Sequence, residues 1–259
     1  MLETGVPTVL VLIHGRPVSF ETDPSANSGR HSSLLDFPNL RAVLTAWRPG
    51  EAGGTSIVNL LLGKMTTGGG GPSGRLAQAW PRSVGEIGGP STPWFQPRNG
   101  KWMTNHRGPV DPTDGLNHYD PYVNEPSSPR FAFGFGLTFT RFEYADAVAT
   151  VRSSEVSVAV TLYNRGESDG VEVVQVYVTA PLDNVVRYWK RLLGFRKVLV
   201  TAGQKIRVTL PIDTDDLAVY TTATPGSPEA GVRSLLHGVY TVSVGGSSAT
   251  DVTKTSFSL

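Results

Sequence analysis

The sequence predicts an α/β layer with parallel strands, followed by an antiparallel β-sandwich. An unbroken apolar run near the start and a second run followed by helical spacing indicate the layer. A regular alternation of apolar and polar residues from about position 131 onward indicates the sandwich. The composition agrees, since 29 glycines, 19 prolines and only 17% charged residues favour strands and loops over helical bundles.

The first 63 residues have the pattern of a βα unit. The run Val9–Ile13 is followed by Gly-Arg-Pro, as expected of a strand buried on both faces in a parallel sheet. A second strand is predicted over Ala42–Trp47, and a helix after it has apolar residues at helical spacing until Gly63. We expect Glu51 in the first turn of this helix, where a carboxylate favours the positive end of the helix dipole.

Residues 64–130 have no sustained period. They contain four consecutive glycines, many prolines and scattered aromatic residues, which predicts long loops over a surface.

The second half alternates with period two. Val156, Val158, Val160 and Leu162 share one face of a predicted strand, and Ile206–Ile212 repeats the pattern. Further strands are predicted by the runs Val171–Val178, Leu193–Val200, Leu217–Tyr220 and Val239–Val244. Short strands at this spacing predict a β-sandwich with its own core, which we expect to fold alone.

The composition excludes several kinds of site. Basic and acidic residues number 23 and 22 with no basic block, so we expect no nucleic-acid or membrane partner. Without cysteine there is no disulfide and no thiolate site. The histidines lack ligand spacing, so no metal site is expected; they are His14, His31, His106, His118 and His237. The longest apolar run, Val6–Ile13, is too short to span a bilayer, and no targeting segment is visible.

A series of motifs then carries a resemblance to a known family. The motifs are, in order, Val11–Pro17, Ala46–Gly54, Pro72–Leu76, Trp80–Ser83, Phe133–Tyr144, Asn164–Gly166, Gly170–Tyr177 and Leu192–Phe195. This series resembles the C-terminal part of family 3 glycoside hydrolases of the β-glucosidase type. The resemblance implies that residues 1–130 are the truncated end of the family's α/β sandwich domain, with long loops. It implies a fibronectin type III-like antiparallel β-sandwich over residues 131–259.

The resemblance also implies an activity and where its chemistry lies. Family members hydrolyse O-glycosyl bonds of oligosaccharides or β-glycosides with retention, in carbohydrate catabolism and without a metal or organic cofactor. Retention needs two carboxyl groups about 5–5.5 Å apart. In the family the nucleophilic aspartate lies in an N-terminal barrel and the acid/base glutamate in an earlier loop, and neither segment is in this chain. We therefore expect no catalytic residue here, and no activity from this chain alone.

Eight acidic residues of the first 130 positions lie in no motif that the resemblance links to catalysis. They are Glu21, Asp36, Glu51, Glu86, Asp111, Asp114, Asp120 and Glu125. Five residues of the loops are candidates for substrate binding, because aromatic faces stack on sugar rings: Trp94, Trp102, His118, Tyr119 and Asp120. The competing interpretation is that these side chains fasten the loops to a core.

Three functions remain open at this point. The chain is expected to be a fragment of a β-glucosidase whose partner is the missing N-terminal barrel domain, and which is secreted or periplasmic in its full-length form. Alternatively, it is a noncatalytic module that binds carbohydrate or a protein. A structural adhesion domain would suit residues 131–259 but leaves the βα motifs unexplained. A parallel sheet without its leading strands exposes apolar faces, so we expect residues 1–63 to be marginally stable in isolation.

Overall fold

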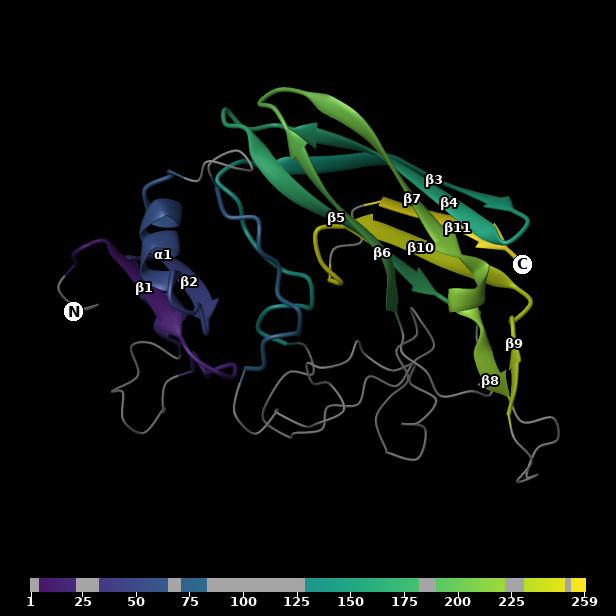
Figure 1. Ribbon diagram of the computed structural model, residues 1–259, viewed down its shortest axis with the longest axis horizontal. Coiled ribbons are helices and arrows are strands. Elements are labelled where there is room, and N and C mark those ends of the chain that lie inside the picture. Colours follow the sequence, from purple (N-terminus) through teal and green to yellow (C-terminus); the bar gives the residue numbers. More distant parts are fainter. Residues whose placement is uncertain are drawn as a thin grey trace.

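The computed structural model shows a small α/β layer and a β-sandwich, with an extended segment running between them (Figure 1). It describes residues 5–21, 33–64, 71–82, 129–181, 190–221, 231–249 and 253–259. No helix within these ranges is long and apolar enough to cross a membrane.

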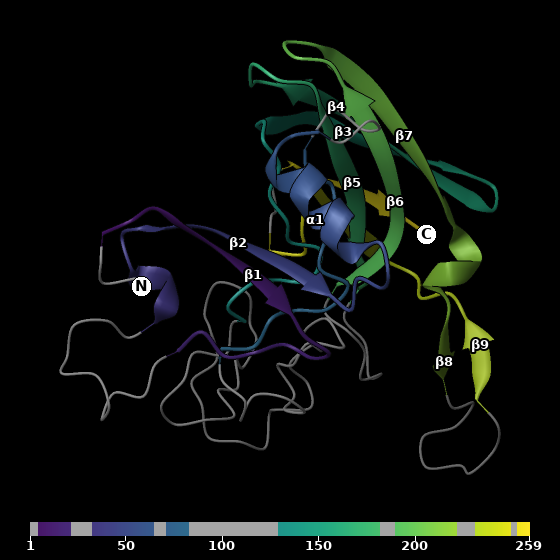
Figure 2. The same ribbon diagram turned by 60° about the vertical axis from the view of Figure 1, so that its left-hand side comes forward.

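The α/β layer consists of two parallel strands, β1 (Thr8–Ile13) and β2 (Leu40–Trp47), followed by α1 (Gly53–Leu61). Figure 2 shows the arrows of both strands pointing the same way. The short 3-10 helix η2 (Leu34–Asp36) precedes β2 and starts with a capping box between Ser33 and Asp36. The predicted βα unit is therefore confirmed.

The start of α1 differs from the prediction. Glu51 lies in a turn before the helix and not in its first turn. The cause is the turn at Gly50, which has φ +72° and whose carbonyl accepts a hydrogen bond from the Gly53 N–H. A Cβ atom on Gly53 would stand 2.6 Å from the Pro49 ring, so the helix begins where glycine allows this close approach.

The expectation that the first strand is buried on both faces is wrong for this chain. Among the described residues, β1 pairs only with β2, so both strands are edges. Val9 is 47% exposed and Ile13 67%, while Leu62 after α1 is 60% exposed. We call the exposed apolar residues of this layer the uncovered set; they are Val9, Ile13, Val43, Val58, Leu61 and Leu62. This exposure is what a parallel sheet without further strands and helices should show.

The sandwich consists of two antiparallel sheets, with strand orders β11-β10-β5-β6 and β3-β4-β7. Its strands are β3 (Phe142–Arg152), β4 (Glu155–Asn164), β5 (Gly170–Thr179), β6 (Arg191–Val200), β7 (Lys205–Asp213), β10 (Val239–Gly245) and β11 (Thr253–Ser258). The 3-10 helix η5 (Thr214–Leu217) leads to a small hairpin of β8 (Val219–Thr221) and β9 (Val232–Ser234).

The core lies between the two sheets, as the alternation predicted. The inward residues of β4, from Val156 to Leu162, are fully buried and share a cluster with Leu210 of β7 and Val176 of β5. The rings of Tyr240 and Phe257 stack at 5.1 Å. Burying such side chains removes apolar area from water and stabilises the sandwich.

Residues 71–82 and 129–136 form the connection between the layer and the sandwich, and we call them together the stem. Their backbones exchange hydrogen bonds: the Leu76 N–H donates to the Phe135 carbonyl (2.9 Å) and the Trp80 N–H to the Phe131 carbonyl (2.7 Å). Gly134 donates in return to Leu76. Two segments that residues 83–128 separate in the sequence are thereby held side by side.

Candidate functional site

One end of the stem packs against the carboxyl ends of the parallel strands through Trp80. This residue is 2% exposed, and its indole N–H donates to the Val18 carbonyl at 2.7 Å. Its ring stacks on Phe20 at 5.5 Å and meets the edge of His14 at 5.3 Å. A buried tryptophan with its N–H satisfied is a stable anchor for the stem.

His14 directly follows β1, and Trp47 is the last residue of β2. The imidazole Nε2 of His14 is 2.6 Å from the Thr45 hydroxyl, and Nδ1 is 2.5 Å from the Arg16 carbonyl. Its ring centroid is 4.6 Å from that of Trp47, whose backbone φ of +52° is strained for a bulky residue. Because both imidazole nitrogens have partners, His14 is fixed in place, and the cluster acts as packing.

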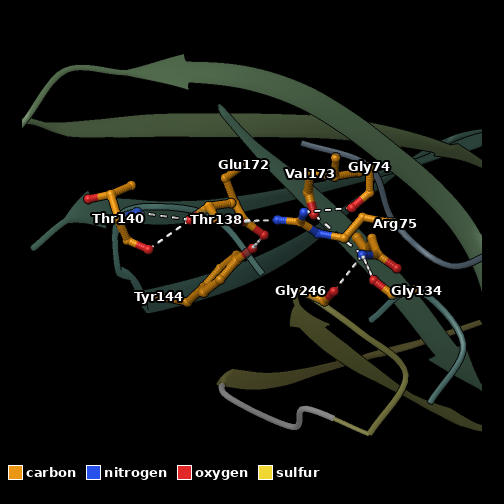
Figure 3. A network of polar contacts seen from close by, with 10 residues as sticks. Gly74, Arg75, Gly134, Thr138, Thr140, Tyr144, Glu172, Val173 and Gly246 are labelled. Carbon is orange, nitrogen blue, oxygen red and sulfur yellow. Dashed lines mark hydrogen bonds and ion pairs between the residues drawn. The ribbon is translucent and has the colours of Figure 1, made fainter. Parts of the chain in front are cut away.

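The other end of the stem enters the sandwich through Arg75. Its Nη2 donates to Oε2 of Glu172 on β5 at 2.8 Å, and the two side chains are 8% and 5% exposed. The Tyr144 hydroxyl of β3 donates to the other carboxylate oxygen at 2.8 Å. Figure 3 shows the guanidinium and the phenol meeting at the carboxylate of Glu172. A buried carboxylate with a cationic and a hydroxyl donor is well satisfied.

Gln175 holds the second stem segment to the same strand. Its Nε2 donates to the carbonyls of Gly134 (3.1 Å) and Gly246 (2.7 Å), and its Oε1 accepts from the Tyr177 hydroxyl. Gly134 has φ +80°, and a Cβ atom there would stand 2.0 Å from the Gln175 Oε1. Glycine is therefore required at this point of the stem.

The Phe-Gly-Phe-Gly motif, Phe133–Gly136, joins the stem to the sandwich, since the Ser248 N–H donates to the Phe133 carbonyl at 2.9 Å. Gly134 lies against polar side chains, and Gly136 lies against the Gly74 carbonyl and Arg75. Close approach of polar groups explains both glycines.

Burial governs the acid–base behaviour of this network. It raises the pKa of Glu172, against the lowering effects of Arg75 and the Tyr144 hydroxyl. Burial also raises the pKa of the phenols of Tyr144 and Tyr177 well above the ordinary value, with the neighbouring Glu172 charge adding to the effect at Tyr144. Both phenols therefore remain protonated donors over the physiological range.

Two carboxylates of the described α/β layer make structural contacts. Asp36 caps η2, and Glu21 is 3.7 Å from Arg130 of the stem. Within the described ranges, no group of three or more His, Asp and Glu side chains is placed to hold a metal ion. The five candidate substrate-binding residues, Trp94, Trp102, His118, Tyr119 and Asp120, lie outside the described residues, as do Glu86, Asp111, Asp114 and Glu125.

Sequence reasoning included Arg75 and Glu172 in separate motifs but did not bring them together. One signal was available: the alternation of β5 places Glu172 on the face of Val174 and Val176, which are core residues. A carboxylate at an inward position requires a buried partner. The identity of that partner, 97 residues earlier in the chain, was not readable from the pattern.

Comparison with known proteins places these features in a family. Residues 1–139 match the family model described as the glycosyl hydrolase family 3 C-terminal domain, and residues 172–248 match a fibronectin type III-like domain. A periplasmic β-glucosidase of Salmonella typhimurium is 29% identical over 241 residues, which are 91% of this chain and 28% of that protein. A β-xylosidase of Formosa agariphila is 28% identical over 257 residues, which are 98% of this chain and 30% of that protein.

Solved structures agree with this placement. The structure of a β-glucosidase from Erythrobacter marinus is 28% identical with a TM-score of 0.73, and covers 99% of this chain and 28% of that one. The chain thus spans less than a third of the length of these relatives. By its sequence and its fold, this chain belongs to glycoside hydrolase family 3, to whose C-terminal region it corresponds.

Proposed function

We propose that this chain is the noncatalytic C-terminal part of a retaining β-glucosidase-type glycoside hydrolase. Its substrate class would be oligosaccharides or glycosides with a terminal β-linked glucose or a related sugar. The relatives described as β-glucosidase and β-xylosidase support this substrate class. The chain matches under a third of their length, which supports the proposal that the catalytic residues lie in another part of such an enzyme. We further propose that the α/β part covers residues 1–130 and the sandwich residues 131–259.

The observation that carries this proposal is the uncovered set on β1, β2 and α1. Six apolar side chains are more than a third exposed on a two-stranded parallel sheet and its helix. In stable proteins, helices cover both faces of a parallel sheet, and the edge strands are paired with further strands or covered. The occupant we propose is the remainder of a family 3 enzyme, whose strands, helices and barrel would cover this layer and bring the catalytic carboxylates.

A chimera tests this proposal. The Salmonella typhimurium relative would have its matching part replaced by these 259 residues, and hydrolysis of a chromogenic β-glucoside would be measured. We expect the chimera to be active and a second chimera with Val9→Asp and Ile13→Asp to lose activity, because charges cannot be buried under a sheet. Full activity of the second chimera would show that the uncovered set is not a docking face.

A noncatalytic carbohydrate-binding module is the alternative. It would use the loop residues Trp94, Trp102, His118, Tyr119 and Asp120, whose aromatic faces and polar groups suit sugar rings. Affinity electrophoresis of the chain in gels containing soluble β-glucan tests this alternative. Retarded migration that is lost in a Trp94→Ala, Trp102→Ala variant would support it, and unchanged migration would reject it.

A further inference from the structure

The contact between the stem and the sandwich depends on a buried pair of opposite charges. Glu172 points to the same face of β5 as the core residues Val174 and Val176. Arg75 reaches this carboxylate from the stem, and the Tyr144 hydroxyl occupies its second oxygen. Both charges are removed from water, because the side chains are 8% and 5% exposed.

Other ion pairs between described residues are more exposed. The side chains of Arg130 and Glu21 are 24% and 30% exposed, those of Arg165 and Glu143 are 45% and 51% exposed, and the pair of Arg233 with Asp215 is exposed as well. Exposed pairs contribute little to stability, whereas a buried charge without its partner is strongly unfavourable. The consequence of losing one partner should therefore be large at Arg75 and Glu172 and small at Glu143.

The surroundings leave Arg75 no second counter-charge among the contacts of the described residues. Its Nη1 donates to the Gly74 carbonyl at 3.0 Å, and its buried Nε has no hydrogen-bond partner. Gly246 lies close to Glu172, where a Cβ atom would stand 3.1 Å from the carboxylate oxygen Oε1. Within the described ranges, the carboxylate of Glu172 is thus the group that neutralises the guanidinium.

We propose that Arg75 and Glu172 form a charge latch that holds the stem on the sandwich. While both charges are present, opening of the stem has to separate them. When one charge is removed, the other is left buried without a partner, and the stem opens more easily because opening returns that charge to water. This property belongs to the chain's own residues and holds whether or not the proposed hydrolase function is correct.

Hydrogen–deuterium exchange of the whole chain tests the latch. The stem is reported by the amides of Leu76, Trp80 and Gly134, which donate within the stem. The amides of α1, which lies outside the stem and the sandwich, serve as the reference. In Glu172→Gln and in Arg75→Gln we expect stem amides to exchange at least about tenfold faster while α1 amides keep their rates, because the unpaired buried charge raises the free energy of the closed stem.

Three further variants decide whether charge is the cause. Glu143→Gln removes a carboxylate from an exposed pair and should leave stem exchange as in the wild type. Arg75→Lys keeps the positive charge and should lose less protection than Arg75→Gln. The double variant Arg75→Gln, Glu172→Gln leaves no unpaired charge, so its loss should be smaller than the combined losses of the two single variants.

Several results would overturn the latch. Single variants whose stem amides exchange as slowly as those of Glu143→Gln would do so. An equal acceleration in the stem and in α1 would indicate a general loss of stability instead. Additive losses in the double variant, or Arg75→Lys behaving as Arg75→Gln, would show that the charges are not coupled.

Discussion

The guanidinium of Arg75 lies 2.8 Å from the carboxylate of Glu172, although the two residues are 97 positions apart in the sequence. The contact joins the α/β part of the chain to the inner face of β5, where both charges are buried. The sandwich is therefore more than an appended domain. It supplies a site for Arg75 on the inner face of β5, and Gln175 with Tyr177, on the opposite face of this strand, forms a separate socket for Gly134.

Gly134→Ala should destabilise the chain by about 2–4 kcal/mol, because the new methyl group would overlap the Gln175 Oε1 and the backbone has positive φ. Urea unfolding followed by tryptophan fluorescence measures this loss. Gly74→Ala is the matched control in the same stem, since no atom lies within 4 Å of its Cβ position. Equal stability of the two variants would contradict the described socket.

Gly54→Ala should stabilise α1 by about 0.5–1 kcal/mol, because Gly54 is inside the helix with open space around its Cβ position. Gly53→Ala should have the opposite effect, since its methyl group would overlap the Pro49 ring. The midpoint of thermal unfolding of each variant checks both signs. The same sign for both substitutions would show that α1 begins elsewhere.

Alkaline solution should unfold the sandwich through its buried phenols. The pKa of Tyr144 and of Tyr177 is raised in the folded state, so their contribution is fully present below about pH 10, the ordinary tyrosine pKa, and is lost as the pH rises above it. Each phenol should cost about 1.4 kcal/mol of stability per pH unit in that range.

Urea unfolding at several pH values above 10 measures this slope. Tyr177→Phe should make the slope shallower, while Tyr220→Phe, at a side chain that is 69% exposed, should keep the wild-type slope. Identical slopes in Tyr177→Phe and in the wild type would contradict the burial of the Tyr177 phenol.

Asn164→Ala should destabilise the sandwich by about 2–4 kcal/mol, because several buried groups lose their partner at once. The Asn164 amide donates to the carbonyls of Ser168 (2.8 Å) and Val200 (2.9 Å), and its oxygen accepts from Thr140. Ser157→Ala, on the outward face of β4, is the control and should change stability by less than about 0.5 kcal/mol. Similar values for the two variants in urea unfolding would refute the role of Asn164.

The strands with strong apolar alternation, such as β4 and β7, were predictable from the sequence, because a strand with one buried face repeats every two residues. β3 was not predicted as a separate strand. Its pairing with β4 is irregular between Ala145 and Val148, where Asp146 has φ +54°. The residues that face the core are therefore even-numbered before this bulge and odd-numbered after it, which interrupts the alternation in the sequence. β11 has a single large apolar residue, Phe257, and gives almost no pattern.

The candidate site was less accessible to prediction. Motifs indicated the family and identified the glycines of the stem, because glycine spacing is a local property. The meeting of Arg75 with Glu172, and of Gly134 with Gln175, depends on how two distant segments lie on β5. The exposure of Val9 and Ile13 was foreseeable only from the physics of an incomplete parallel sheet.

We propose that this chain supports a catalytic site whose carboxylates lie elsewhere, and the glycosidase activity of the chain alone tests this proposal most directly. The purified 259 residues would be incubated with chromogenic β-glucoside and β-xyloside substrates, and release of the chromophore would be measured. We predict a rate equal to that of buffer alone. Turnover that disappears when one of the chain's own carboxylates is replaced by an amide would contradict the account.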